Sequence, residues 1–102
     1  MQSGRENIIN ETISHNLKII RNNTYYVYYG KSGTLRKRVT LMQVAKALGV
    51  TFQQIQKYEK NKNTVSASKL KVLADYFEVP IQDLYEPIGT YNKDIIQNES
   101  IV

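Results

Sequence analysis

The segment from residue 40 to residue 59 reads as a helix, a glycine and a second helix in immediate succession. Apolar residues recur at helical spacing in its first half, at Leu41, Val44, Ala45 and Leu48. Gly49 follows, and glycine readily adopts the left-handed backbone that ends a helix. Thr40 and Thr51 each precede one of the two helices, where a side-chain oxygen caps first-turn amides. The segment therefore predicts two short helices joined by a sharp turn.

A helix and a β-hairpin are expected before this segment. Residues 1–9 are mostly polar and are expected to form a flexible end. Apolar residues then recur at helical spacing, at Ile9, Ile13, Leu17 and Ile20. Residues 24–39 contain many strand-forming residues on both sides of a turn that runs from Gly30 to Gly33. We therefore expect one helix, ending near Asn23, and then a hairpin.

Two further helices are expected after residue 59. Asn61 tolerates a left-handed backbone and marks the end of the preceding helix. Ser66 is placed to cap the next one. The inward residues of that helix are Leu70, Leu73, Ala74 and Phe77. A proline at the first turn favours a helix start, so Val79-Pro80 predicts a short fifth helix carrying Ile81, Leu84 and Tyr85.

These elements predict the fold class and the division of the chain. We expect an all-α domain of five helices over residues 10–86, with the hairpin inserted between the first and second helices. Residues 87–102 have weak periodicity and mixed polarity, and they are left as a C-terminal tail without assigned structure.

The charge distribution indicates a polyanionic partner. From Thr12 to Ala74 the chain has twelve Lys or Arg residues and one acid, Glu59, whereas the net charge of the whole chain is only +5. Nucleic acid is the commonest polyanion inside a cell. The sequence contains no cysteine, and it has neither a signal peptide nor an apolar run long enough to cross a bilayer. We therefore expect a cytoplasmic protein without a membrane partner.

Catalysis and metal binding find no support in the residues. Asp75 and Glu78 have no His or Cys near them in the sequence, and no glycine-rich phosphate loop is present. His15 is the only histidine, so a metal site would lack its usual second nitrogen or sulfur ligand. The sequence predicts neither an enzyme nor a cofactor.

The segment TLMQVAKALGVTFQQIQKYE, residues 40–59, resembles the helix-turn-helix of the lambda-repressor-like family, also called the Xre or Cro type. The resemblance continues through VSASKL at residues 65–70 and Val79-Pro80, and so covers about residues 40–85. It implies a five-helix domain, usually dimeric on double-stranded DNA. It also implies that the second helix lies against phosphates and that the third helix reads base edges in the major groove.

The resemblance also implies a set of DNA-contacting residues. The positions that would read bases are Phe52, Gln53, Gln56 and Lys57. Glutamine can pair with adenine, lysine with guanine, and an aromatic ring can touch a thymine methyl group, although Phe52 could equally pack beneath the turn. The positions that would meet the DNA backbone are Thr40, Thr51, Lys60, Lys62 and Asn63. Leu41 departs from the family, which commonly has Gln there, so backbone amides would have to replace its phosphate contact.

Glu59 requires separate explanation because its carboxylate would repel DNA. In the family, the matching Glu pairs with an Arg of the first helix, and Arg21 occupies that place here. The resemblance therefore implies a partly buried ion pair that ties the first helix to the recognition helix.

The hairpin is the second departure from the family, which usually joins its first two helices by a few residues. It ends in Arg36-Lys37-Arg38, immediately before the helix end that would face phosphate. Strand alternation places Arg36 and Arg38 on one face, and we expect both to contact DNA, with a solvated charge run as the alternative. Its tyrosines could pair across a dimer, lie against DNA or cover the first helix.

Three functions remain open at this level. The first is a sequence-specific transcriptional regulator that represses from a palindromic operator as a homodimer. The second is an antitoxin that represses its own promoter while the tail after Pro87 binds a toxin. The third is a protein-interaction module that uses the tyrosine hairpin and does not bind DNA.

Overall fold

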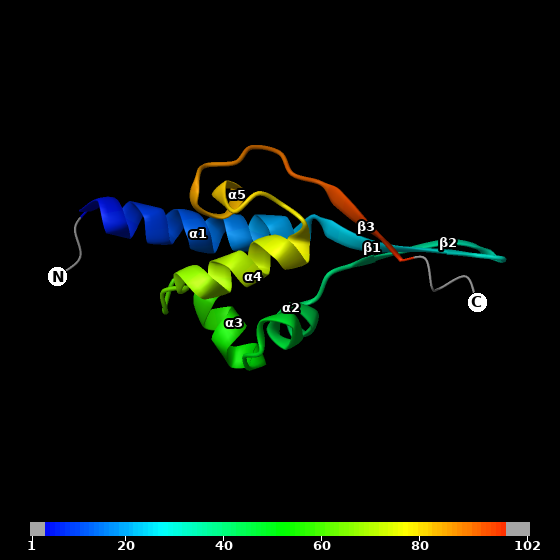
Figure 1. Cartoon of the computed structure of the whole chain (residues 1–102), viewed down its shortest axis with the longest axis horizontal. Helices are drawn as coiled ribbons and strands as arrows, with labels where there is room; N and C mark the ends of the chain where they lie inside the picture. Colours follow the sequence, from blue (N-terminus) through cyan, green and yellow to red (C-terminus); the bar gives the residue numbers. More distant parts are fainter. Residues whose placement is uncertain (1–3, 98–102) are drawn as a thin grey trace.

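Helices and a small sheet alternate along the chain in the structure, a computed structural model that describes residues 4–97 (Figure 1). The helices within this range are α1 (Gly4–Asn22), α2 (Leu41–Leu48), α3 (Phe52–Glu59), α4 (Ala67–Phe77) and α5 (Gln82–Tyr85). The strands are β1 (Thr24–Gly30), β2 (Gly33–Arg38) and β3 (Lys93–Gln97). Figure 1 shows α1 along the length of the helical body, with α2 and α3 on one side of it and α5 on the other.

Local capping sets the boundaries of α2 and α3. The Thr40 hydroxyl accepts a hydrogen bond from the Gln43 amide at 3.1 Å, and the Gln43 side chain accepts one from the Thr40 amide at 2.9 Å. Gly49 ends α2 in the left-handed region at φ 73°. The Thr51 hydroxyl then accepts from the Gln54 amide at 3.1 Å. Because each signal acts within about four residues, these boundaries fall where the sequence predicts them.

The helices pack around one apolar core. Its fully buried side chains include Leu17, Ile20, Val44, Ile55, Leu73, Phe77 and Leu84. The apolar face predicted for the first helix is buried from Ile13 onward, but Ile9 remains 39% exposed. The helix itself begins at Gly4 instead of near residue 10, so residues 4–9 are helical and not a loose end. Residues 4–9 extend the backbone hydrogen bonding of α1 toward the N-terminus, although their side chains are exposed. Residues 1–3 lie outside the described range.

The expectation of an all-α fold is wrong, because the described residues also form a three-stranded sheet in the order β2-β1-β3. β1 and β2 form the expected antiparallel hairpin, which Gly30 and Gly33 close. β3 comes from the tail left unassigned and pairs with β1 in parallel, with Thr24 opposite Lys93. A short strand whose only partner is distant in sequence has little local signal, which is why periodicity did not reveal it.

The sheet joins the helical body at its base and then extends away from it (Figure 1). The Tyr26 and Tyr76 hydroxyls are hydrogen-bonded, which ties β1 to α4. Burial, followed by this hydrogen bond, raises the pKa of Tyr76 above its usual value, so the Tyr76 hydroxyl keeps its proton at ordinary pH. The Val39 amide donates to the Thr24 carbonyl at 2.9 Å and directs the chain from β2 into α2.

Candidate nucleic-acid interface

α3 buries one face and presents the other to solvent. Its buried residues are Ile55, Tyr58 and Glu59. Gln53, Gln56 and Lys57 lie at positions that share the opposite face of a helix. Gln53 and Lys57 are exposed and Gln56 is half-buried. The outward face of α3 therefore carries amide and ammonium groups, which can donate hydrogen bonds to base edges.

The ion pair expected between Arg21 and Glu59 is present. Arg21 Nε donates to Glu59 Oε2 at 2.6 Å, and Arg21 Nη2 donates to Glu59 Oε1 at 3.0 Å. The two side chains are only 14% and 7% exposed. A two-point contact of this kind fixes the relative orientation of both groups. The pair thus neutralises the acid of α3 and holds α3 against α1.

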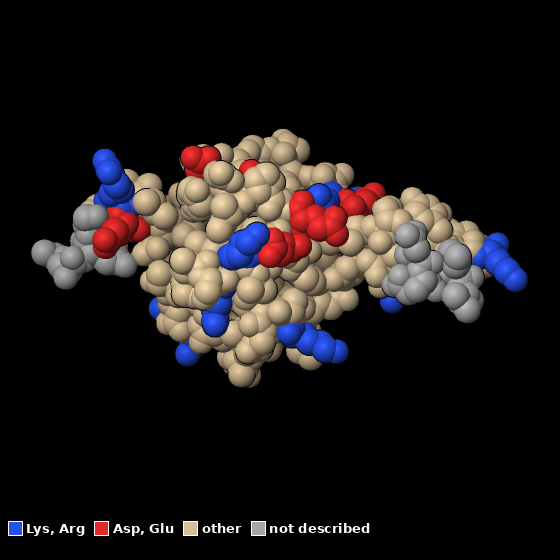
Figure 2. Space-filling view, in the orientation of Figure 1, with Lys and Arg blue, Asp and Glu red and all other residues tan. Residues whose placement is uncertain are grey.

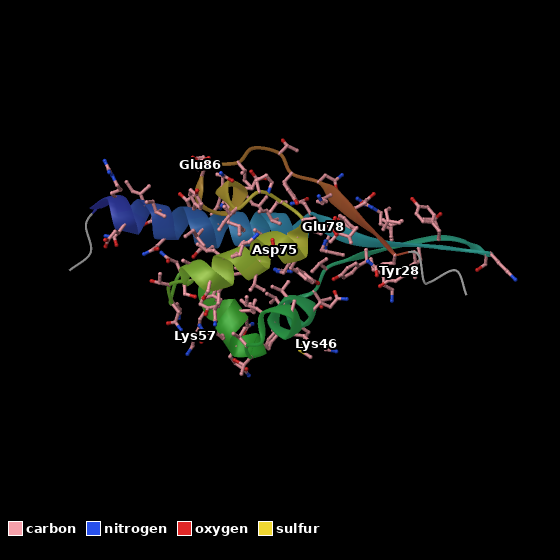
Figure 3. All side chains as sticks on the ribbon, viewed as in Figure 1. Tyr28, Lys46, Lys57, Asp75, Glu78 and Glu86 are labelled. Atoms are coloured by element: carbon pink, nitrogen blue, oxygen red, sulfur yellow. The ribbon has the colours of Figure 1, made fainter. Side chains whose placement is uncertain are left out.

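The cations of α2 and α3 lie on one side of the molecule. Figure 2 shows Lys and Arg along the lower edge, around α2 and α3, where no Asp or Glu is visible; in the middle and upper parts of the same view, acids lie beside further Lys and Arg. Figure 3 shows Lys46 and Lys57 on that lower side, and Asp75, Glu78 and Glu86 above it. Lys60, Lys62 and Asn63 are also exposed where α3 ends and the following loop begins. This separation makes the α2–α3 side attractive to a polyanion.

Lys46 is a residue that the sequence analysis missed. It is exposed in the last turn of α2, and it accompanies Lys57 on the lower side of Figure 3. The helical period places Lys46 opposite the buried Val44 and Ala45 of the same helix, so its exposure could have been predicted from the sequence.

At the start of α2, Leu41 stands where the family commonly has the glutamine that contacts phosphate. Leu41 is half-buried against the core, and the Gln43 side-chain oxygen accepts from Thr40 in the capping box, which fixes that side chain against the helix start. Thr40 is itself exposed. The donors left for an anion are the Gln43 side-chain NH2 group and the backbone amides of the first turn, which carry the positive end of the helix dipole.

The Arg36 and Arg38 side chains are exposed but are hydrogen-bonded to neighbouring residues. Arg36 Nη2 lies 3.0 Å from Asp94 Oδ1 and also donates to Asn92 Oδ1 at 3.1 Å. The Arg36 guanidinium stacks over the Tyr25 ring at 3.6 Å from its centroid. Arg38 Nη2 donates to the Tyr25 hydroxyl at 3.2 Å. The sequence analysis did not place β3, and hence Asp94, beside Arg36; the expected phosphate contacts of the two arginines stay predictions.

The remaining expected residues lie at the ends of α3. Thr51 is exposed but its hydroxyl caps the helix, and Phe52 is half-buried at the first helical position. Among residues 4–97, no three side chains of the metal-binding types converge on one point. None of the helices in this range is both long and apolar enough to cross a membrane.

The comparisons with known proteins agree with this geometry. The profile of the helix-turn-helix family matches residues 35–84. An uncharacterised HTH-type transcriptional regulator of Sinorhizobium fredii is 42% identical over 78 residues, which cover 74% of this chain and 54% of that protein. One from Sinorhizobium medicae is 38% identical over 63 residues, covering 59% of this chain and 45% of that protein. The chain thus spans about half the length of these relatives.

A solved structure supports the fold independently. The SOS-response transcriptional repressor LexA of Eubacterium rectale superposes with a TM-score of 0.56 at 23% identity, over 81% of this chain and 79% of that chain. At this identity, the likeness concerns the fold alone. The family match also agrees with the expectation that the chain is not an enzyme. Residues 35–84, with their capped helices and buried acid, therefore place the chain in the lambda-repressor-like family of helix-turn-helix proteins.

Proposed function

We propose that the chain is a sequence-specific, DNA-binding transcriptional regulator whose α3 enters the major groove. The observation that carries this proposal is the arrangement of α3 itself. Its acid, Glu59, is buried and paired with Arg21, while Gln53 and Lys57 point into solvent. A carboxylate that faced the groove would oppose binding, and here it is both turned inward and neutralised.

The exposed groups of α3 suit two kinds of contact. Gln53 and Gln56 would pair with adenine and Lys57 with guanine, and these contacts would select sequence. A second set would meet phosphates and supply affinity without selectivity: Thr40, Thr51, Lys46, Lys60, Lys62 and Asn63. Arg36 and Arg38 are left out because their guanidinium groups, although exposed, are already bonded to Asp94 and to the Tyr25 hydroxyl.

The proposed mode of action is repression in the cytoplasm from a palindromic operator. Two copies related by a two-fold axis would place their α3 helices in successive major grooves, about 34 Å apart. The names of the relatives support regulation of transcription, and the separation of charge on the surface supports a DNA-facing side.

The test is a fluorescence-anisotropy titration of labelled DNA from the gene's own upstream region against scrambled DNA. Lys57→Ala is expected to remove about 1–3 kcal/mol of preference for the specific DNA. Lys71→Ala is the matched control, because Lys71 is an exposed lysine of α4 paired with Asp75. Weak binding that is insensitive to salt and identical in both variants would contradict the proposal and favour a protein-interaction module.

A further inference from the structure

The two faces of the hairpin carry different chemistry. Strand pairing aligns Tyr25 with Arg38, and Tyr26 with Lys37. Because side chains alternate along a strand, Arg36 and Arg38 share the Tyr25 face, whereas Lys37 shares the opposite face with Tyr26 and Tyr28. The Tyr26 and Tyr28 ring centroids lie 6.4 Å apart, in agreement with that placement.

On the face that carries Arg36 and Arg38, both guanidinium groups are already hydrogen-bonded, and Arg36 is paired with an acid. Asp94 and Asn92 of the C-terminal segment accept hydrogen bonds from Arg36, and the Tyr25 hydroxyl accepts one from Arg38. A phosphate that approached this face would have to compete with a carboxylate already in place. The cation of β2 on the other face is Lys37, which is exposed.

The Lys37 face is turned toward the side of the molecule that α3 uses. Figure 3 shows Tyr28 on the lower side of the sheet, the side on which α2 and α3 carry Lys46 and Lys57. Lys37 precedes the α2 cap, Thr40, by three residues of chain. At about 3.3 Å per extended residue, that separation is about 10 Å. Val39 between them is buried and hydrogen-bonded to Thr24, so the connection is held in place.

We propose that Lys37 binds a backbone phosphate of double-stranded DNA outside the bases read by α3, so that the hairpin acts as a second point of contact. This inference rests on the proposed function of α3. Lys37 supplies a point charge without a fixed hydrogen-bonding plane, so the contact adds affinity and salt dependence but no sequence preference. The Arg36–Asp94 pair lowers the net positive charge of the opposite face of the sheet.

The experiment measures how DNA affinity depends on salt for two duplexes. One covers only the site protected by α3, and the other extends it by about ten base pairs on each side, or one helical turn. Lys37→Ala is expected to reduce the slope of log affinity against log salt by about 0.9 on the extended duplex, the value for one phosphate. The preference of the Lys37→Ala variant for specific over scrambled DNA is expected to stay unchanged. Lys37→Arg is expected to restore the slope.

Lys31→Ala is the matched control, because Lys31 is an exposed lysine at the tip of the same hairpin. It is expected to leave the slope unchanged. An equal loss in both variants would overturn the inference, because it would indicate diffuse attraction to the whole hairpin. If Lys37→Ala shows the same slope of log affinity against log salt as the wild type on the extended duplex, the inference is overturned as well. Failure of the proposed function is read separately, as weak, salt-insensitive binding in which neither the wild type nor Lys57→Ala prefers specific over scrambled DNA.

Discussion

The α2–α3 unit and the three-stranded sheet differ in how far apart in sequence their stabilising partners lie. In α2–α3, each helix end is set by a cap within a few residues, such as Thr51 with the amide of Gln54. In the sheet, β1 relies on β3, where Thr24 pairs with Lys93. The difference teaches that a short local pattern can specify the candidate recognition element, whereas its neighbouring sheet depends on contacts that form only after the chain has folded.

The ion pairs of the two regions show a second contrast, in their exposure to solvent. Arg21–Glu59 is almost enclosed, with side chains 14% and 7% exposed. Arg36–Asp94 has an N···O separation of 3.0 Å, against 2.6 Å for Arg21–Glu59, and its side chains are 42% and 46% exposed. Water screens the second pair and not the first, so the two should differ widely in their effect on stability.

Glu59→Ala should give the largest effect, and it tests that contrast directly. Removing the carboxylate leaves the Arg21 guanidinium buried without its partner, so the free energy of unfolding should fall by about 3–5 kcal/mol. Urea denaturation followed by circular dichroism measures the loss. Asp94→Ala is the matched change in the sheet and should cost less than about 1 kcal/mol. Similar losses in the two variants would mean that burial does not separate the two pairs.

Ile95→Ala should give an intermediate effect confined to the sheet. Ile95 is 7% exposed on β3, and its truncation should cost about 2 kcal/mol, the low end for a buried isoleucine. Hydrogen exchange should show faster exchange of β1 amides, with α3 amides unchanged. Ile96→Ala is the control, because Ile96 is 49% exposed. Loss of protection in α3 as well would show that the sheet and the helical body unfold as one unit.

Gly49→Ala should give the smallest effect, and it measures the contribution of the left-handed backbone at the turn between α2 and α3. Gly49 has φ 73°, and a Cβ built there would meet no atom within 4 Å. The cost is therefore conformational alone, about 1 kcal/mol. Thermal unfolding measures it, and Gly89→Ala, with equally open space but no positive φ, serves as the control. A loss of several kcal/mol in the free energy of unfolding would imply that Gly49 contributes more than its preference for a left-handed backbone.

The candidate site was predictable to different extents along its length. Gln53 and Lys57 were assigned from the family resemblance and are exposed on α3, and Arg21 was correctly paired with Glu59. Arg36 was assigned to phosphate, but its partner Asp94 lies in a strand that periodicity could not reveal. Lys46 was readable from the helical period and was overlooked.

The sequence by itself determined the helices of the helix-turn-helix, their caps at Thr40 and Thr51, and the turn at Gly49. These features depend on hydrogen bonds and backbone preferences that span a few residues. Only the tertiary structure decided that β3 joins the hairpin, that Arg36 pairs with Asp94, and that Lys37 lies on the opposite face of the hairpin from Arg36. Those outcomes follow from a parallel pairing between distant segments, and strand alternation then determines which face each charge occupies.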